Sequence, residues 1–320
     1  MEHNTQQSPL VSLVCDTYNQ AAYIGQVLEG FLMQKTTFPV EILVHDDAST
    51  DGTREIVERY AAEHPDKIRT ILRRENMFSR DQKILEHYVF PHCCGKYIAI
   101  CEGDDYWTDP EKLQRQIAYM EAHPECTLCF HAAELVDADG RHIGVQSPYD
   151  HDCIVPTSDV IRGMGGFCPT VSLVVPAELA KNRPAFCDLT SVDDAPLQIY
   201  FASRGTTYYF AKPMAAYRVN AAGSWTLAQR ELKREKRIAL QQSLIAMHTA
   251  FDEDTKGRFH EDVAYALTVD NFEILWLKDD LKTMKQPQFR AFYKKLPFRS
   301  RVRLHVQTYA PWLYGLRKGR

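Results

Sequence analysis

Short apolar runs without polar alternation recur along the first third of the chain, a pattern typical of strands buried on both faces. They are Leu10–Cys15, Val40–His45, Ile68–Leu72 and Tyr97–Cys101. Between them lie segments with apolar residues at helical spacing, Ala22–Gln34, Arg54–Glu63 and Asp81–Phe90. Strands separated by helices of this length predict an α/β fold with a mostly parallel sheet built from right-handed crossovers.

The pattern changes in the second half of the chain. A helix near Pro110–His123 and strands at Cys126–His131 and Val171–Val175 still fit an α/β domain. Ser147–Pro156 reads as irregular, and the glycines in Val160–Phe167 predict a flexible loop. From about Thr226 only helical patterns remain, at Lys233–Ala250, His260–Leu277 and Gln288–Lys295. We therefore expect an α/β domain over residues 1–225 and a helical C-terminal region over residues 226–320.

Short polar side chains follow three of the predicted strands. They occupy Asp16–Asn19, Asp46–Asp51 and Glu102–Asp105. Ligands of parallel α/β sheets bind at the carboxyl ends of the strands, so these segments are expected to share one crevice. The chain has no G-x-G-x-x-G after the first strand and no G-x-x-x-x-G-K-[ST], which argues against dinucleotide-binding and P-loop proteins.

The densest of these polar segments is the acidic turn, which we define as Glu102, Gly103, Asp104 and Asp105. Clustered carboxylates repel one another and resist burial, and hard oxygen ligands favour Mg²⁺ or Mn²⁺. The alternative is a solvated turn before the helix that starts near Asp109. That reading explains Asp109 better than it explains the turn, so the sequence favours a site for a metal and a nucleotide.

Composition and charge narrow the class of protein. The 320 residues are 45% hydrophobic and 25% charged, as in ordinary globular proteins, and the nine cysteines, an odd number, fit reduced thiols better than disulfides. Cys126-x-x-Cys129, with Cys93 and Cys94 as possible companions, is only a weak zinc pattern. No apolar window is long enough to span a membrane, and Met1–Gln7 does not resemble a secretory signal, so we expect a cytoplasmic protein.

The net charge of −4 is unevenly distributed. Lys282–Arg320 holds eleven Lys or Arg residues and no Asp or Glu, so the rest of the chain is strongly acidic. Aromatic and aliphatic residues are interleaved with these basic ones, namely Phe298, Val302, Leu304, Tyr309, Trp312, Leu313, Tyr314 and Leu316. This basic tail predicts either peripheral binding to the anionic inner face of a membrane or a helix docked on its own domain. No recognised nucleic-acid module accompanies the charge, so we expect no nucleic-acid partner.

The segment Cys101–Trp107 resembles the acidic metal-binding motif, of D-x-D type, of family 2 glycosyltransferases, which are inverting enzymes with the GT-A fold. The resemblance implies transfer of a sugar from a UDP- or dTDP-sugar to an acceptor hydroxyl, in building a bacterial surface polysaccharide or lipo-oligosaccharide on a glycan or lipid-linked acceptor. It implies that Asp104 binds Mn²⁺ or Mg²⁺, that Glu102 binds the ribose or the metal, and that Asp105 takes either role.

Two earlier stretches resemble the same family in the same order. Val11–Gln20 is similar to its P-T-Y-N loop, with Asp16 in place of proline, and this implies that Thr17 and Tyr18 contact the nucleotide. Ile42–Thr53 is similar to its V-D-D-x-S-x-D-G-T run, which implies that Asp47 accepts a hydrogen bond from the imide of the base. The residues Ser49 to Asp51 are expected to cap the following helix.

A third stretch, Ser191–Leu197, resembles the family's E-D-x-P-L. The resemblance implies that Asp194 is the general base, which takes the proton of the acceptor hydroxyl, and that Asp193 positions the acceptor. The alternative, an N-cap for the helix that follows, is compatible with this role.

Further residues complete the predicted site. Arg80 and Lys83 fall where relatives carry a basic residue near the diphosphate, although a solvated helix face would explain them equally. Tyr217–Asn220 resembles a Y-R-x-H segment whose histidine completes the metal site, but Asn220 stands in its place, and His151 is another possible ligand. Two rival functions remain open from the sequence: a nucleotidyltransferase, and a non-catalytic module that binds sugar nucleotides or glycans.

Overall fold

The computed structural model of the chain describes residues 8–81, 83–221, 224 and 232–310. The predictions on Met1–Gln7 and on Trp312, Leu313, Tyr314 and Leu316 lie outside the described residues. The chain forms two compact units. Unit 1 contains residues 1–187 and 193–230, and unit 2 contains residues 188–192 and 231–320.

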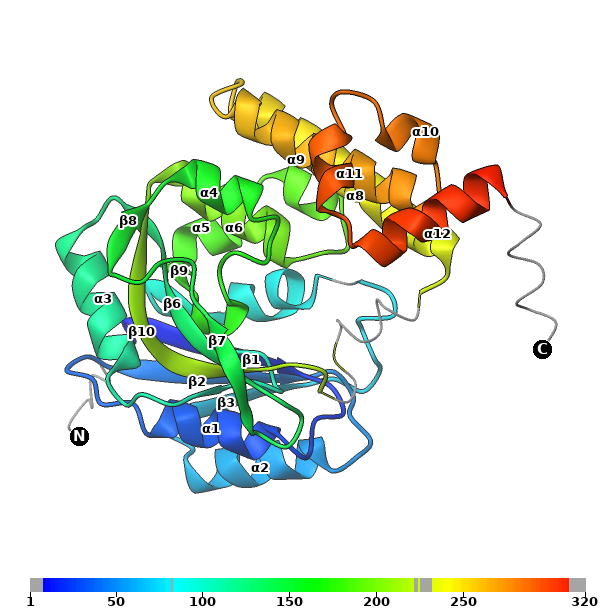
Figure 1. Ribbon diagram of the computed structural model, residues 1–320. Helices are drawn as coiled ribbons and strands as arrows, with labels where there is room; N and C mark the ends of the chain where they lie inside the picture. Colours follow the sequence, from blue (N-terminus) through cyan, green and yellow to red (C-terminus); the bar gives the residue numbers. More distant parts are fainter. Residues whose placement is uncertain (1–7, 82, 222–223, 225–231, 311–320) are drawn as a thin grey trace, which may run out of the picture. The chain divides into compact units, whose positions relative to one another are not determined.

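Unit 1 is built on a ten-stranded sheet with the order β3-β2-β1-β4-β9-β6-β10-β5, where β7 pairs with β6 and β8 with β10 (Figure 1). The strands are β1 (Val11–Thr17), β2 (Val40–Asp46), β3 (Ile68–Leu72), β4 (Tyr97–Ile100), β5 (Tyr106–Trp107), β6 (Cys126–Val136), β7 (His142–Gln146), β8 (Cys153–Val155), β9 (Val174–Pro176) and β10 (Thr206–Arg218). The predicted parallel sheet is present from β3 to β4. Beyond β4 the sheet is mixed, because β9 runs antiparallel to both β4 and β6.

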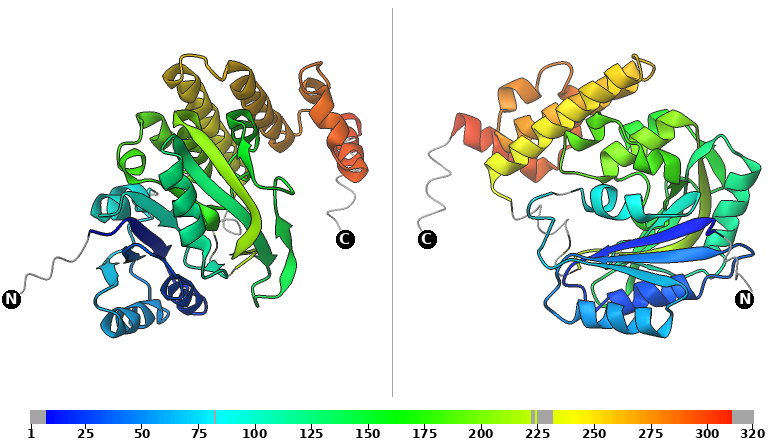
Figure 2. Two further views of the ribbon diagram at one scale, coloured as in Figure 1. Left: turned by 90° about the vertical axis from the view of Figure 1, so that its left-hand side faces the viewer. Right: turned by 180° about the vertical axis from the view of Figure 1, so that it is seen from behind.

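Helices cover the sheet of unit 1 (Figures 1 and 2). They are α1 (Ile24–Leu32), α2 (Thr53–Glu63), α3 (Lys112–Ala122), α4 (Thr157–Arg162), α5 (Ala177–Lys181) and α6 (Asp194–Arg204). In the core, apolar residues of β1 and β2 such as Leu13 and Val44 belong to one cluster with Phe31 of α1 and Trp107 of β5. The rings of Phe31 and Trp107 have centroids 4.6 Å apart. This packing fixes the backbone immediately after the acidic turn.

Several predicted segments differ from the structure. Ser147–Pro156, expected to be irregular, contains strand β8. The helix expected over Asp81–Phe90 is a π-helix, η1 (Leu85–Val89), followed by a 3₁₀ turn, η2 (Phe90–His92). The strand expected over Val171–Val175 is shorter, because the 3₁₀ turn η3 (Thr170–Ser172) precedes β9.

The predicted loop Val160–Phe167 begins inside α4. The helix ends at the glycines, where Gly165 has φ +81° and a Cβ would lie 2.9 Å from the backbone nitrogen of Ala195. Glycine is therefore needed for both the backbone conformation and the close approach to α6.

Unit 2 is helical, as the sequence pattern predicted. Its helices are α8 (Arg234–Asp254), α9 (His260–Leu277), α10 (Leu281–Met284), α11 (Arg290–Lys295) and α12 (Phe298–Tyr309). The 3₁₀ turn η4 (Ala185–Asp188) ends at Asp188, the first residue of the short segment 188–192 that belongs to unit 2. Buried His248 of α8 and Asp270 of α9 form a hydrogen bond of 2.8 Å between Nδ1 and Oδ2. Among the described residues, no helix combines the length and hydrophobicity that crossing a membrane requires.

A buried lysine lies beneath the sheet of unit 1. Lys112 is fully buried, its Nζ lies 4.0 Å from the ring centroid of Trp107, and Nζ has no hydrogen-bond partner within the described part of the chain. Burial lowers its pKa from 10.5 to about 7. The folded protein therefore pays a desolvation cost whenever this amine is protonated.

This arrangement predicts a specific pH dependence of stability. Between about pH 7 and 9 the unfolded chain holds the Lys112 proton and the folded chain releases it, so the free energy of unfolding rises with pH. The contribution is at most about 1.4 kcal/mol per pH unit. Urea denaturation at both pH values should show this rise reduced in Lys112→Met and unchanged in a control, Lys96→Met, whose exposed amine pairs with Glu121. Equal pH slopes in the wild type and Lys112→Met would contradict the prediction.

Candidate functional site

The acidic turn leaves the end of β4 and folds against the end of β1. The Gly103 N–H donates to the Asp16 carbonyl at 3.1 Å. A Cβ at Gly103 would lie 2.1 Å from Gln20 Oε1 and 2.7 Å from Thr17 Oγ1. Only glycine fits between the two strand ends. Glu102 precedes this glycine, and Asp104 and Asp105 follow it.

The carboxylates of the turn lie in a weakly solvated environment, in which Asp105 is 1% exposed and Glu102 and Asp104 are partly exposed. Burial raises the pKa of Glu102, and the charges of Asp194, Asp105 and Asp104 raise it further. Burial also raises the pKa of Asp105, with contributions from Asp104 and Asp194. The acid at the start of α6 thus lies within electrostatic reach of the acidic turn, although some ninety residues of sequence separate them. The structure brings together the predicted metal-binding and base residues.

Arg218, at the end of β10, holds the acidic turn in place. It is 3% exposed, its backbone N–H donates to Asp105 Oδ1 at 2.7 Å, and its Nε donates to the Asp104 carbonyl at 2.8 Å. The guanidinium also lies 4.5 Å from the ring centroid of Tyr23 and donates to Gln26 Oε1 at 2.7 Å. Burial raises the pKa of Asp104, and the positive charge of Arg218 opposes part of this rise. Sequence reasoning missed this role; the only signal was the position of Arg218 in Tyr217–Asn220.

The donor set of the turn suits a hard cation. Asp105 Oδ2 is buried and has no hydrogen-bond partner among the described residues, so an oxygen is available to a ligand. Within the same residues, no three His, Cys, Asp or Glu side chains form a complete metal-binding group. Mg²⁺ is commonly held by one or two carboxylates together with substrate phosphates. The turn therefore fits a metal whose remaining ligands come from a phosphorylated substrate.

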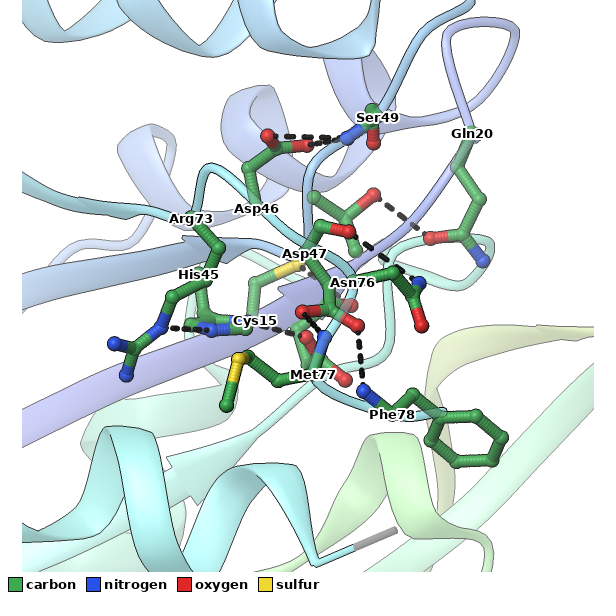
Figure 3. Close-up of polar contacts among 12 residues, drawn as sticks. Cys15, Gln20, His45, Asp46, Asp47, Ser49, Arg73, Asn76, Met77 and Phe78 are labelled. Carbon is green, nitrogen blue, oxygen red and sulfur yellow. Dashed lines mark hydrogen bonds and ion pairs between the residues drawn. The ribbon is translucent and has the colours of Figure 1, made fainter. Parts of the chain in front are cut away.

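The ends of β1 and β2 form the second part of the site (Figure 3). Asp47 is buried, and its two carboxylate oxygens accept the N–H groups of Met77 at 2.7 Å and Phe78 at 3.0 Å. His45 Nδ1 lies 2.8 Å from Asp16 Oδ1, and Arg73 Nε donates to His45 Nε2 at 3.1 Å. Because Nε2 accepts this bond, Nδ1 carries the imidazole proton. The predicted base contact of Asp47 stays a prediction, and each of its oxygens keeps a lone pair for it.

The remaining residues of the first loop are divided between core and surface. Thr17 is buried and donates from Oγ1 to Gln20 Oε1 at 2.8 Å, whereas Tyr18 is 45% exposed. Gly52, at φ 101°, is the N-cap residue of α2 and has no side chain to cap it. The expected capping of α2 holds for Asp51, whose Oδ1 accepts the N–H of Thr53, the first residue of the helix, at 3.0 Å.

Ser49 and Thr50 contact the β1 loop instead of α2. Ser49 Oγ accepts the N–H of Asn19 at 2.9 Å, and the Thr50 N–H donates to Asn19 Oδ1 at 2.8 Å. These two bonds tie the β2 loop to the β1 loop.

Asp193 and Asp194 begin α6 and face different partners. The N-cap alternative for Asp194 is wrong, because Asp194 is the first residue inside α6 and the N-cap residue is Asp193, whose side chain makes no capping hydrogen bond. Instead Asp193 Oδ1 accepts from Lys83 Nζ at 2.5 Å. Asp194 Oδ1 accepts from Thr170 Oγ1 at 2.9 Å. Lys83, which the sequence predicts near a diphosphate, therefore contacts Asp193 of the acid pair, which we define as Asp193 and Asp194.

The sequence also predicts that Arg80, His151 and Asn220 bind the diphosphate or the metal. Arg80 is exposed and pairs with Glu75 at 2.7 Å. His151 is exposed, and its Nδ1 lies 2.7 Å from Asp150 Oδ1. Asn220 follows β10 in a left-handed conformation with φ 61°. Their predicted roles in binding diphosphate or metal stay predictions.

Part of the chain matches a known protein family, and a longer part matches an uncharacterised relative. Residues 12–147 match the family model "Glycosyl transferase family 2". The uncharacterised protein Rv1520 of Mycobacterium tuberculosis is 34% identical over 229 residues, which are 70% of this chain and 63% of that protein. This chain therefore spans less than two thirds of the length of that relative.

Two Bacillus subtilis proteins match shorter stretches. "Putative glycosyltransferase EpsE" is 36% identical over 115 residues, 36% of this chain and 40% of EpsE. "Putative teichuronic acid biosynthesis glycosyltransferase TuaG" is 29% identical over 136 residues, 42% of this chain and 51% of TuaG. With the family model, these matches support the predicted resemblance to family 2 glycosyltransferases.

Solved structures share the fold. Staphylococcus aureus TarS 1–349 in complex with UDP-GlcNAc aligns with a TM-score of 0.60 at 16% identity, over 92% of this chain and 86% of TarS 1–349. The Pyrobaculum calidifontis mannosyltransferase PcManGT, in complex with GDP-Man and Mn²⁺, aligns with a TM-score of 0.55 at 19% identity, over 97% of this chain and 83% of PcManGT. The predicted GT-A fold, an α/β sheet flanked by helices and followed by C-terminal helices, is confirmed.

Proposed function

We propose, from the match of residues 12–147 to the model of glycosyl transferase family 2, that this chain transfers a sugar from a UDP- or dTDP-sugar to an acceptor hydroxyl with inversion. The observation that supports the proposal is the link between Asp194 and the strand after the acidic turn: Thr170 Oγ1 donates to Asp194 Oδ1 at 2.9 Å, and the carbonyl of the next residue, Val171, accepts from Trp107 Nε1 at 2.9 Å. The charge of Asp194 accordingly adds to the raised pKa of Glu102 and Asp105. Inverting transfer needs a carboxylate on the acceptor side, opposite the leaving nucleotide, and we assign this role to Asp194.

Each part of the site has a proposed role. Asp194 takes the proton of the attacking hydroxyl, and Asp193 positions the acceptor. Thr17, Tyr18 and Asp47 bind the nucleoside, and Glu102 and Asp105 bind the ribose or complete the metal site; these five residues lie at or after the ends of β1, β2 and β4. Arg80, in the segment after β3, approaches the diphosphate. Asp104 and Glu102 hold Mn²⁺ or Mg²⁺, and such an ion, when bound, neutralises charge that develops on the departing diphosphate.

Burial increases the basicity of the Asp194 carboxylate. A desolvated carboxylate is a stronger base than one in water, and burial raises the pKa of Asp194. Thr170 opposes this shift by donating a hydrogen bond to the ionised form. The hydroxyl of Thr170 thereby also fixes the carboxylate in one orientation.

The names of the relatives suggest the biological setting. TuaG is named for teichuronic acid biosynthesis, and TarS was solved with UDP-GlcNAc. We propose that the acceptor is a glycan or a lipid-linked glycan and that the product contributes to a cell-surface polysaccharide.

The experiment that tests this function is a donor panel with the 320-residue chain. UDP-, dTDP- and GDP-sugars are screened by thermal shift with Mn²⁺, where a ligand at a hundredfold its Kd stabilises by about 2.7 kcal/mol. Donors that bind are then incubated with the protein, and the products are separated. Release of nucleoside diphosphate supports a glycosyltransferase. Consumption of sugar 1-phosphate with nucleoside triphosphate would indicate a nucleotidyltransferase, and binding without turnover would indicate a binding module.

Helix α12 supports a further proposal, that the basic tail binds an anionic membrane surface. Phe298, Val302 and Tyr309 are 73%, 43% and 62% exposed. At 100° per residue they form one apolar stripe, flanked by Arg299 and Arg301. Aromatic residues with flanking basic residues suit the headgroup region of a bilayer.

We expect the protein to cosediment with vesicles that contain phosphatidylglycerol and to stay in solution with pure phosphatidylcholine vesicles. The double variant Phe298→Ser, Val302→Ser should lose most of this binding, whereas Ile143→Ser, Val145→Ser, which removes exposed apolar residues of β7, should keep it. Equal binding by both double variants would contradict the proposal.

A further inference from the structure

Lys83 lies in a segment with unusual backbone geometry. It precedes the π-helix η1, and π-helical turns are rare and often occur at functional sites. Asp81 fixes this segment, because its Oδ1 accepts the Lys83 N–H at 3.0 Å and its Oδ2 lies 2.6 Å from His87 Nδ1. The Lys83 backbone is therefore held by local contacts before its side chain extends to any other element.

The side chain of Lys83 ends on the acid pair. Lys83 is 5% exposed, and its Nζ donates to Asp193 Oδ1 at 2.5 Å, while the Asp193 side chain keeps 35% of its surface exposed. Behind this pair lies buried Glu86, which is 3.6 Å from Arg183. Burying a lysine amine against a carboxylate costs desolvation free energy, and exposed ion pairs provide solubility without that cost. Solubility alone therefore does not explain why Lys83 is buried.

The neighbouring acid is immobilised by a different group. Thr170 donates to Asp194, and the loop before it is held by buried Gln198. Gln198 Nε2 donates to the carbonyls of Gly165 at 2.7 Å and Cys168 at 2.9 Å, and its Oε1 accepts the Cys168 N–H at 3.1 Å. The two acids of the pair are thus fixed separately, one by a cation and one by a hydroxyl.

We propose that Lys83 is a positioning residue of the acceptor side: by holding Asp193 Oδ1 at the start of α6, it orients Asp194 toward the acceptor hydroxyl and places the other oxygen of Asp193 to bind a second hydroxyl of a polyol acceptor. This inference rests on the proposed function. It differs from a role on the donor diphosphate, because a lysine engaged with Asp193 contributes to transfer without contributing to donor binding. Donor affinity and transfer rate therefore distinguish the two roles.

The test compares Lys83→Met, Lys83→Arg and the control Lys96→Met, which removes an exposed lysine that pairs with Glu121. Donor Kd is measured by calorimetry with Mn²⁺, and kcat and acceptor KM by release of nucleoside diphosphate. Lys83→Met should lower kcat by about 10- to 100-fold and raise acceptor KM, with donor Kd within about twofold of the wild type, because misplacement of a base by about 1 Å has effects of this size. Lys83→Arg, which keeps the charge, should recover most of kcat, and Lys96→Met should match the wild type.

Two results would overturn the inference. A donor Kd weakened about tenfold in Lys83→Met, with kcat unchanged, would place the lysine on the donor. Unchanged kcat, KM and Kd would show that the ion pair has no role in transfer.

A wild-type protein that turns over no donor would defeat the proposed function instead. The ion pair is then tested alone by a urea-denaturation cycle of Lys83→Met, Asp193→Asn and the double variant. Non-additive effects support the pairing on which the inference depends, and additive effects reject it.

Discussion

Asp194→Asn is expected to lower kcat for sugar transfer by about 10²- to 10⁴-fold, the range typical of a lost general base. The amide keeps the size of the side chain and can still accept from Thr170 Oγ1, which lies 2.9 Å from Asp194 Oδ1 in the native protein. Folding should therefore be preserved, and donor Kd should change little. The loss should appear in kcat at saturating donor, measured by release of nucleoside diphosphate.

The matched control for this variant is Asp139→Asn, in an exposed turn where the acid pairs with Arg141 at 2.7 Å. It should retain wild-type kcat. The companion variant Asp193→Asn is expected to raise acceptor KM and to lower kcat less than Asp194→Asn does, because the carboxylate of Asp193, held by Lys83, positions the acceptor and does not take its proton. If Asp193→Asn abolished transfer and Asp194→Asn did not, the roles of the two acids would have to be exchanged.

Asp104→Asn is expected to remove the dependence of donor binding on Mn²⁺. A carboxylate is a much better ligand for a hard cation than an amide, and the metal would otherwise connect the acidic turn to the diphosphate. In thermal denaturation with saturating donor, the wild type should gain about 2.7 kcal/mol at a hundredfold the Kd, and the variant should lose most of this gain when Mn²⁺ is present. Backbone contacts through the Asp104 carbonyl, which accepts from Arg218, are kept.

The control for the metal variant is the same measurement in EDTA. Wild type and Asp104→Asn should then bind the donor with similar, weak affinity. An Mn²⁺-dependent gain of equal size in both proteins would show that the metal, if it binds, does so without Asp104.

Much of unit 1 could be predicted because local signals and tertiary structure agree there. The apolar strands β1, β2 and β4 are buried on both faces, and such strands leave a clear signal in the sequence. The acidic turn follows directly from β4. Its glycine is required because a Cβ at Gly103 would lie 2.7 Å from Thr17 Oγ1. In unit 2 the helix predicted over His260–Leu277 has the same bounds in the structure.

The antiparallel half of the sheet could not be predicted in the same way. β9 has three residues, too few to show a periodic pattern, and it inserts between β4 and β6, which lie earlier in the chain. Pairing partners at this separation depend on the tertiary fold, and a strand this short carries no local information about them. The π-helix η1 was read as an ordinary helix for a related reason, because its apolar residues satisfy helical spacing.

The supporting contacts of the site were also beyond sequence reasoning. Arg218 reaches the acidic turn across 114 positions of sequence, and Lys83 reaches Asp193 across 110. A basic residue in isolation is more often a solvated surface residue, so neither role has a local signature. The acids themselves were found because several carboxylates at one strand end are unusual, whereas a single partner cation is not.

The central claim is that Asp194 and the acidic turn form one site that transfers a sugar in a single displacement. The anomeric configuration of the product, read from the proton NMR spectrum of the isolated glycoside after reaction with the donor identified by the panel, tests it most directly. An α-linked donor sugar should give a β-linked product. A product that retains the α configuration would contradict the account, because Asp194 would then not act as the base of a direct displacement.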